Sequence, residues 1–535
     1  MQRTTRSSTR ARSQFALVLA LATTAMAAPG AAAEPVTVTI GHTTPGNVFA
    51  SDAVPSFDVS TAAPQVSWTA HDYWGQEVAT GTTPTVDGHA HLRVEVDVPG
   101  YFELRVEAAD TEAAEAVETS FAVLAPASRS ATDPVRFGVQ THFAHGWDPG
   151  IIVPLLTNIG VQTVRDAQQW QLIETSPGGY DFGVEDGRFE EYMEALAEHS
   201  VEPLINFGLY NPNHDGGATP YTEEGRQAFA RFVQEVLAHY GDQIGQVGVY
   251  NEPNSLKFGD RGDGPADARP DYHADLAQAV YEAVQEVRPD VNVVAPELLA
   301  KTQDFADGLP WLEEYLRAGG ADALDVVSLH PYRACCTPET LPDDIADVRR
   351  LMDENGAADA PIWFSELGWP TNDKSEHTTE RAQAQYLPRS YVLAFSAGVE
   401  RFYWYNFMDH NSGPFGLLRR PGDPRGDYTP KPSYVAYGVM TAQLSGLSYE
   451  GPERAPDGVR SHRFGDGTTT VRTMWAPDAD TPVRLMTNKP IQVTDTMGVT
   501  RTITPYRGSV SLTLTGDPLY VRGDVKAVLR PRSTT

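Results

Sequence analysis

The feature that most constrains this chain is a regular alternation of short apolar strands with amphipathic helices between residues 135 and 446. In the helical stretches, apolar residues recur at i, i+3, i+4 and i+7, as in Phe189–Leu196 and Phe229–Val236. The strands recur at a mean spacing of about 38 residues, which is the length of one unit of a (β/α)8 barrel. The eight predicted strands are Arg136–Val139, Thr163–Arg165, Pro203–Phe207, Gln246–Tyr250, Val291–Ala295, Val326–Leu329, Pro361–Phe364 and Phe402–Tyr405.

A doubly wound open sheet is the alternative fold for such an alternation. That fold binds dinucleotides through a glycine-rich turn after its first strand, and no such turn follows Val139. The pattern therefore favours an α/β fold of the TIM-barrel type. On both sides of it the sequence alternates apolar and polar residues between turns, which predicts a β-sandwich at each end. The predicted domains are a signal peptide (1–33), an N-terminal Ig-like β-sandwich (34–125), a linker (126–134), the barrel (135–446) and a C-terminal β-sandwich (447–535).

The first 33 residues have the organisation of a secretory signal. Four arginines precede the apolar run Phe15–Ala28, and Ala31–Ala33 offers a small-residue cleavage site. A retained membrane anchor is the alternative, but the apolar run is too short to span a bilayer on its own. We expect export, to the extracellular space or the cell surface.

The charge of the chain excludes some partners. The formal net charge is −30 over 535 residues, and so acidic a surface repels nucleic acid and anionic membranes. It also keeps an exported protein soluble, which is the simpler explanation of the bias. No membrane insertion is expected, and the oligomeric state does not follow from the sequence.

Two glutamates stand where the active site of a barrel is built. Glu252 follows the fourth predicted strand in Asn251-Glu252-Pro253-Asn254, and Glu366 follows the seventh in Ser365-Glu366-Leu367-Gly368-Trp369. Residues just past the carboxyl ends of barrel strands face the active site, and the two glutamates lie three repeats apart. A pair of carboxylates across a groove is what cleavage of a glycosidic bond requires. A structural ion-pair or capping role for both is the alternative.

Over about 310 residues, these motifs resemble the retaining (β/α)8 glycosidases of clan A, and more narrowly glycoside hydrolase family 39 and its bacterial relatives. The motifs that carry the resemblance are Val164-Arg165-Asp166, Asn251-Glu252-Pro253-Asn254, His330-Pro331-Tyr332, Ser365-Glu366-Leu367-Gly368-Trp369 and Lys431-Pro432. The strand-seven motif is also similar to plant-type β-1,3-glucanases, and family 5 shares the Asn-Glu-Pro.

Catalytic roles follow from the chemistry and the resemblance together. Glu366 would be the nucleophile that attacks the anomeric carbon, and Glu252 the acid that protonates the leaving oxygen. The negative charge of Glu366 is expected to raise the pKa of Glu252, which keeps the acid protonated until the glycosyl-enzyme forms. The resemblance implies that Asn251 holds the sugar 2-hydroxyl. The predicted spacing of the two carboxyl groups is about 5–5.5 Å.

Further residues are predicted to support the site. The resemblance implies that Tyr332 hydrogen-bonds the nucleophile, with a rim aromatic as the alternative, and that Arg165 supplies positive charge beneath it or forms a plain ion pair. His330 would contact sugar or orient a carboxylate. Since strand alternation lets only one of Trp404 and Tyr405 face the sugar, Trp404 is preferred. His142 is expected to reach the sugar, and Trp369 completes the predicted site.

The chemistry needs no cofactor, and no metal site is assigned. Zinc at His142 and His145, which lie three residues apart after the first strand, is considered and not adopted. The adjacent Cys335 and Cys336 could form a vicinal disulfide or remain two thiols. The predicted partner is a carbohydrate, of which the sugar and linkage stay open; β-xylosides, iduronides, arabinosides and exopolysaccharides are substrates of similar barrels. A non-catalytic carbohydrate-binding or scaffolding protein is the functional alternative.

Overall fold

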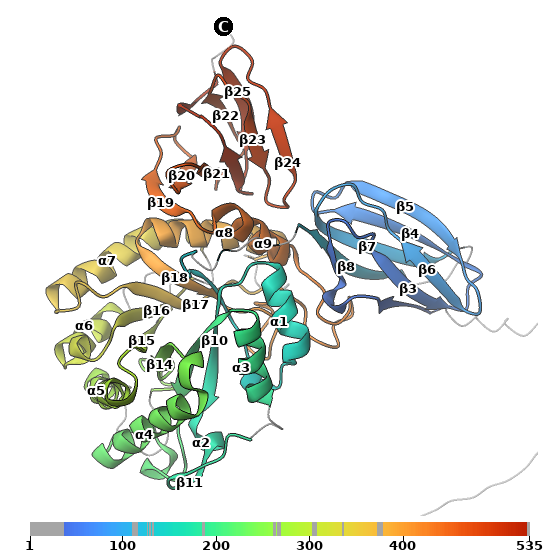
Figure 1. Cartoon of the computed structure of the whole chain (residues 1–535). Coiled ribbons are helices and arrows are strands. Elements are labelled where there is room, and N and C mark those ends of the chain that lie inside the picture. The colour runs from blue at the N-terminus through green and yellow to red at the C-terminus, as the bar shows by residue number, and fades with distance from the viewer. Residues whose placement is uncertain are drawn as a thin grey trace, which may run out of the picture.

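The computed structural model describes residues 37–109, 116–125, 127, 130, 133–183, 188–259, 264, 269–301, 308–333, 336–371 and 378–531. The predicted signal peptide (1–33) and Cys335 lie outside these residues. The described chain has three parts, which are an N-terminal β-rich part, a central barrel surrounded by helices, and a C-terminal β-rich part (Figure 1). Both β-rich parts lie on the side of the barrel formed by α8 (Glu380–Ser396) and α9 (Pro432–Leu444).

Eight parallel strands close into a barrel at the centre of the molecule. The ring is completed where the last strand pairs with the first, with Phe402 beside Phe137. Each of the eight predicted strands overlaps one observed strand, so the predicted TIM-barrel fold is confirmed. In chain order the strands are β9 (Phe137–Gln140), β10 (Thr163–Gln169), β13 (Glu202–Gly208), β14 (Gln246–Val249), β15 (Asn292–Lys301), β16 (Val326–Tyr332), β17 (Ile362–Leu367) and β18 (Val399–Trp404).

The helices surround the outside of the barrel (Figure 1). In α4 (Glu223–Tyr240) the buried residues include Phe229, Phe232 and Val236, as the helical periodicity predicts. Thr222 caps this helix by accepting a hydrogen bond from the backbone N of Gly225 at 3.0 Å. The other helices are α1 (Pro149–Asn158), α2 (Trp170–Ile173), α3 (Arg188–Glu198), α5 (Pro270–Val287), α6 (Leu309–Arg317) and α7 (Leu341–Glu354). Among the described residues, no helix has both the length and the apolar character needed to cross a membrane.

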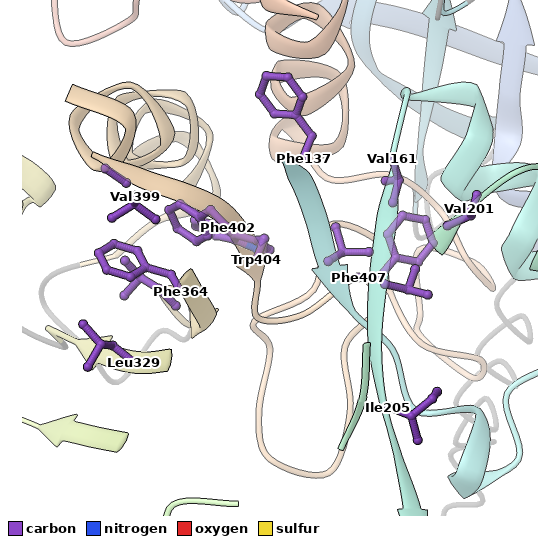
Figure 2. Close-up of a cluster of buried hydrophobic side chains, with 14 of the residues drawn as sticks. Phe137, Val161, Val201, Ile205, Leu329, Phe364, Val399, Phe402, Trp404 and Phe407 are labelled. Carbon is purple, nitrogen blue, oxygen red and sulfur yellow. The ribbon is translucent and has the colours of Figure 1, made fainter. Parts of the chain in front are cut away.

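Large apolar side chains from the strands form the wall on which the site is built. Figure 2 shows Phe364, Phe402 and Trp404 in this buried cluster, and none of the three has exposed surface. Burying one such side chain stabilises the fold by roughly 1.5–3 kcal/mol. The wall is therefore rigid where the strands end, and the polar residues placed there have a fixed scaffold.

The N-terminal part consists of a three-stranded and a five-stranded sheet. Aromatic rings fill the core, with Phe57 edge-on to Phe49 and Phe121 at ring-centroid distances of 5.8 and 5.4 Å. The strands are β1 (Val38–His42), β3 (Ser56–Thr61) and β6 (His89–Arg93) in one sheet, and β2 (Val48–Ala50), β8 (Val117–Leu124), β7 (Gly100–Ala108), β4 (Gln65–Asp72) and β5 (Glu77–Pro84) in the other.

The C-terminal part also has two sheets, of six and three strands. Tyr73 of the N-terminal part donates to Asp517 Oδ1 at 2.6 Å, and Arg381 of α8 contacts Asp517 Oδ2 at 3.1 Å, so one buried carboxylate ties all three parts together. The domain boundaries given above stay predictions. The strands are β19 (Ser448–Pro452), β20 (Arg460–Gly465), β21 (Thr470–Trp475), β26 (Leu519–Arg522), β23 (Ile491–Thr494) and β24 (Thr500–Ile503), then β25 (Ser509–Leu514), β22 (Thr481–Met486) and β27 (Ala527–Leu529); a short hairpin, β11 (Glu174–Ser176) and β12 (Gly179–Tyr180), follows α2.

Candidate active site

The two glutamates meet at the carboxyl end of the barrel. Glu252 lies three residues beyond β14, and Glu366 lies near the end of β17. A carboxylate oxygen of each and a ring nitrogen of His330 all lie within 4.8 Å of one another. The side chains of Glu252 and Glu366 are 13% and 10% exposed. Both carboxylates are thus largely desolvated but still reachable from solvent, as a site for a small substrate requires.

Both oxygens of Glu366 accept hydrogen bonds from strong donors. Arg165 Nη1 donates to Oε1 at 2.7 Å, and the Tyr332 hydroxyl donates to Oε2 at 2.7 Å. Burial, followed by the charge of Glu366, raises the pKa of Tyr332 well above its ordinary value, so this hydroxyl keeps its proton. A cation and a neutral donor therefore fix the direction of both Glu366 oxygens.

Glu252 has a different neighbour. His330 Nδ1 lies 3.1 Å from Glu252 Oε1 and 3.7 Å from Glu366 Oε2. Burial lowers the pKa of His330 to about 3, so the ring is neutral and carries one proton. His330 Nε2 is buried and has no hydrogen-bond partner among the described residues. The neutral ring therefore shares a hydrogen bond with Glu252 through Nδ1 and orients it without adding charge.

Arg165 organises the floor of the site. Besides Glu366 it donates to Gln140 Oε1 at 2.7 Å and to Asn251 Oδ1 at 2.8 Å. The contact with Asn251 fixes which end of this amide faces Arg165, so its NH₂ group remains the donor available to a ligand. Of the two predicted roles for Arg165, the geometry is compatible with both, because the arginine is an ion-pair partner of Glu366 that also sets the direction of its carboxylate.

Glu297 belongs to this floor and was missed in the sequence. It lies in β15, has no exposed surface, and forms a buried ion pair with Arg165 through Oε2. Asn206 Nδ2 also donates to Glu297 Oε2, at 2.5 Å. Burial, opposed by the charge of Arg165, raises the pKa of Glu297 to about 7. The sequence did contain an indication of Glu297, because it is a carboxylate inside the apolar strand 292–300, where an uncompensated charge is costly.

The backbone is strained at two of these glutamates. Glu252 has φ 46° and Glu297 has φ 51°, in the left-handed region that side chains other than glycine rarely adopt. Such strain is retained where surrounding structure imposes it, and it occurs preferentially at functional sites.

The aromatic prediction on strand eight requires a correction. Trp404 has no exposed surface, and its ring lies 5.8 Å from that of Trp369, which is equally buried. Figure 2 shows Trp404 within the hydrophobic cluster. Tyr405 is the partly exposed residue, and its ring lies edge-on to Tyr332 at 6.1 Å. Tyr405, and not Trp404 or Trp369, therefore presents an aromatic surface to the site.

His142 lies at the same end of the barrel, just beyond β9. Its ring is edge-on to Tyr405 at 5.9 Å and stacks on His410 at 4.4 Å. Among the residues that the structure describes, two groups of side chains have the spacing of metal ligands, namely His142, His145 and His410, and the set formed by Glu252, His330 and Glu366. In the second set, the hydrogen bonds of both carboxylates to Tyr332, Arg165 and His330 account for the close spacing.

A separate hollow of about 640 Å³ opens at the other end of the barrel. Residues at the starts of the strands line it, including Arg136, Trp363 and Arg401, and the Arg401 guanidinium covers the Trp363 ring at 4.4 Å. In TIM barrels the chemistry is carried by the carboxyl end, whereas this end serves stability. The hollow is therefore not the candidate active site.

Paired carboxylates at the ends of strands four and seven of a closed barrel are the arrangement that a (β/α)8 glycoside hydrolase requires. Residues 222–423, which contain both glutamates, match the family model described as "Glycosyl hydrolase catalytic core". A comparison with curated proteins gave no match. Residues 222–423 thus carry a glycosyl hydrolase catalytic core, and the predicted resemblance to (β/α)8 glycosidases is confirmed.

Solved structures agree on the fold. A family 39 glycoside hydrolase from Bacteroides cellulosilyticus WH2 is 24% identical with a TM-score of 0.72, covering 91% of this chain and 100% of its own. A family 39 β-xylosidase from Caulobacter crescentus is 18% identical (TM-score 0.53; 75% and 98% covered). A family 30 endoxylanase from Clostridium papyrosolvens C71 is 12% identical (TM-score 0.52; 74% and 98% covered). The chain thus has the fold of the family 39 enzymes.

Proposed function

We propose that the chain is a retaining glycosidase that works by double displacement through a covalent glycosyl-enzyme. The observation that carries this proposal is the distance of at most 4.8 Å between a carboxylate oxygen of Glu252 and one of Glu366. Retaining enzymes hold these groups about 5–5.5 Å apart, whereas inverting enzymes need about 6.5–9.5 Å to accommodate a water molecule. The short distance between the two oxygens supports the retaining arrangement.

Glu366 is the proposed nucleophile. Its contacts with Arg165 and Tyr332 favour the ionised form and aim the oxygens. In the first step it forms a bond to the anomeric carbon as the bond to the leaving oxygen breaks. As the carboxylate becomes an ester its negative charge disappears, and Arg165 retains Glu297 as its counter-ion.

Glu252 is the proposed acid and base. It delivers its proton to the leaving oxygen in the first step and removes a proton from the attacking water in the second. A neutral His330 suits both duties, because it holds Glu252 in place in either protonation state without fixing its charge. By resemblance, Asn251 binds the sugar 2-hydroxyl, a contact expected to strengthen in the transition state.

Xylose-containing substrates are the proposed starting point, since two of the similar structures are a β-xylosidase and an endoxylanase. The test is to follow hydrolysis of aryl β-xylosides, other aryl glycosides and polysaccharides by proton NMR. Retention of the anomeric configuration in the first product is expected, and inversion would refute the mechanism. Absence of turnover on every substrate would favour a carbohydrate-binding or scaffolding protein instead.

Trapping identifies the nucleophile independently. A 2-deoxy-2-fluoro glycoside with a good leaving group should label the protein once, and peptide mass spectrometry should place the label on Glu366. Label on another residue would overturn the assignment. The matched control is Glu194→Gln, which changes a surface residue of α3 and leaves the site unchanged.

We further propose that the protein is exported. The basic segment, the apolar run Phe15–Ala28 and the cleavage site near Ala33 support this proposal. N-terminal sequencing of protein recovered from culture medium should begin near Glu34. Recovery of the full-length chain with cell membranes would show instead that the segment is a retained anchor.

A further inference from the structure

Three histidines from two distant stretches of chain gather at the mouth of the barrel. His142 follows β9, His145 ends a 3₁₀ turn (Phe143–His145), and His410 lies in the loop after β18. One ring nitrogen from each lies within 4.8 Å of the others. They are neighbours because β18 and β9 are the last and first strands of the closed barrel. The catalytic carboxylates belong to a different group of side chains.

Ring contacts hold the three side chains near one another. The rings of His142 and His410 are stacked, with centroids 4.4 Å apart and planes inclined by 16°. The ring of His145 lies 5.3 Å from His410 and 5.5 Å from His142. Trp147 lies edge-on to His142 at 5.3 Å and closes one side of the cluster.

The backbone that carries the histidines is anchored at both stretches. Buried Asp166 accepts from the Thr141 hydroxyl at 2.7 Å and from the backbone N of Phe143 at 2.8 Å, on either side of His142. Next to His410, Asp409 forms an ion pair with Lys431 at 2.7 Å. The arrangement is therefore preorganised, and only side-chain rotation is needed for the rings to converge.

One ring nitrogen of the cluster lacks a partner in the described part of the chain, which indicates that a ligand binds there. His142 Nε2 is buried and has no hydrogen-bond partner among the described residues, although a buried polar atom is normally satisfied. A neutral imidazole has a ring-nitrogen lone pair that can coordinate a metal ion.

We propose that His142, His145 and His410 form a binding site for a divalent transition metal, Zn²⁺ being the reference ion. Three imidazoles without a carboxylate favour Zn²⁺, Cu²⁺, Ni²⁺ or Co²⁺ over Mg²⁺ or Ca²⁺. Zinc–nitrogen distances of about 2.0–2.1 Å require the ring nitrogens to approach more closely than the 4.8 Å limit. Rotation of His145, which is exposed, and of half-buried His410 provides this movement.

The site would sit beside the substrate rather than on the reacting atoms. The His142 ring contacts Tyr405, Tyr405 contacts Tyr332, and Tyr332 donates to Glu366. Three protein ligands leave a fourth tetrahedral position for water or for an oxygen of a bound molecule. The metal site does not require the proposed hydrolysis, so the two can fail separately.

The test uses the full exported chain without a polyhistidine tag, treated with chelator and titrated with Zn²⁺ by calorimetry and with Co²⁺ by visible absorption. One equivalent should bind with a Kd of about 1 µM or tighter, and Co²⁺ should give the absorption bands of a nitrogen-ligated ion. His145→Ala and His410→Ala should each weaken binding at least about 10-fold, in line with the loss of a ligand.

His239→Ala is the matched control, since His239 is a partly exposed histidine of α4 that contacts Glu190 at 2.6 Å, away from the cluster. Thermal unfolding of the chelated variants establishes that each is folded. Weaker binding in the two cluster variants and unchanged binding in the control would support the site. Absence of stoichiometric binding, or equal binding by all four proteins, would overturn it.

Discussion

The two sides of the catalytic pair differ in how their carboxylates are held. Glu366 is bound by the positive charge of Arg165 and by the hydroxyl of Tyr332, whereas Glu252 contacts the neutral ring of His330. The first environment stabilises one protonation state, and the second orients the group without choosing a state. A nucleophile needs the former and an acid that later becomes a base needs the latter. Because the two glutamate side chains are chemically identical, the residues that surround each one determine its role.

Removing the nucleophile should have the largest effect. Glu366→Ala is expected to lower kcat by about 10⁴- to 10⁶-fold, because the covalent step is lost and the other groups act only as a unit with it. Added azide should restore turnover and give a glycosyl azide of inverted configuration, since it attacks in place of Glu366. NMR of the product checks this expectation. An azide product of retained configuration would exchange the roles of the two glutamates.

Removing the acid should have a smaller effect that depends on the leaving group. Glu252→Ala is expected to lower kcat/KM, which reports the first step, about 10²- to 10⁴-fold for leaving groups that need a proton, and far less for activated aryl glycosides. Azide should give the retained product here, because it attacks the glycosyl-enzyme. Paired assays on a nitrophenyl glycoside and an oligosaccharide measure the dependence. Equal losses on both substrates would contradict proton donation by Glu252.

Much of this comparison was accessible from sequence, because spacing reports strand order. The repeat of about 38 residues placed Glu252 and Glu366 on strands four and seven, and the motifs supplied Arg165 and Tyr332. The choice between Trp404 and Tyr405 failed because inward and outward positions differ by a single residue, and the exact end of the strand decides the side.

Two other features depend on contacts between distant segments. Glu297 in the apolar strand 292–300 gave no indication of its partner, since Arg165 reaches it across the barrel. His410 joins His142 only because the first and last strands close the ring. Periodicity identifies elements and their ends, but it does not report which side chains meet between them.

Loss of the Tyr332 hydroxyl should affect the environment of Glu366 and leave that of Glu252 unchanged. Tyr332→Phe removes one donor to Glu366 Oε2. A hydrogen bond to a charged group contributes about 1.5–3 kcal/mol, which corresponds to a loss of about 10- to 150-fold in kcat/KM. Steady-state kinetics measure the loss. Tyr281→Phe, a change to a tyrosine of α5 far from the site, should leave the kinetics unaltered, and an equal effect of both variants would remove Tyr332 from the site.

The smallest expected effect concerns Glu297, which lies in the floor of the site beneath Glu252 and Glu366. Its pKa is about 7 in the folded chain against an ordinary value of 4.5, because burial outweighs the charge of Arg165. A raised pKa in the folded state means that the stability contributed by the protonated form is complete below about pH 4.5 and is lost as the pH rises through 7.

Glu297→Gln lacks this titration. The free energy of unfolding of the wild type relative to the variant should therefore fall between pH 4.5 and pH 8, by an amount on the order of 1–3 kcal/mol. Urea unfolding across this range measures the difference, with Glu194→Gln as the exposed control. A difference that does not change with pH would show that Glu297 stays ionised throughout. Arg165 would then be shared between two permanent carboxylates, and the distinction between the two sides of the site would rest on Tyr332 and His330 alone.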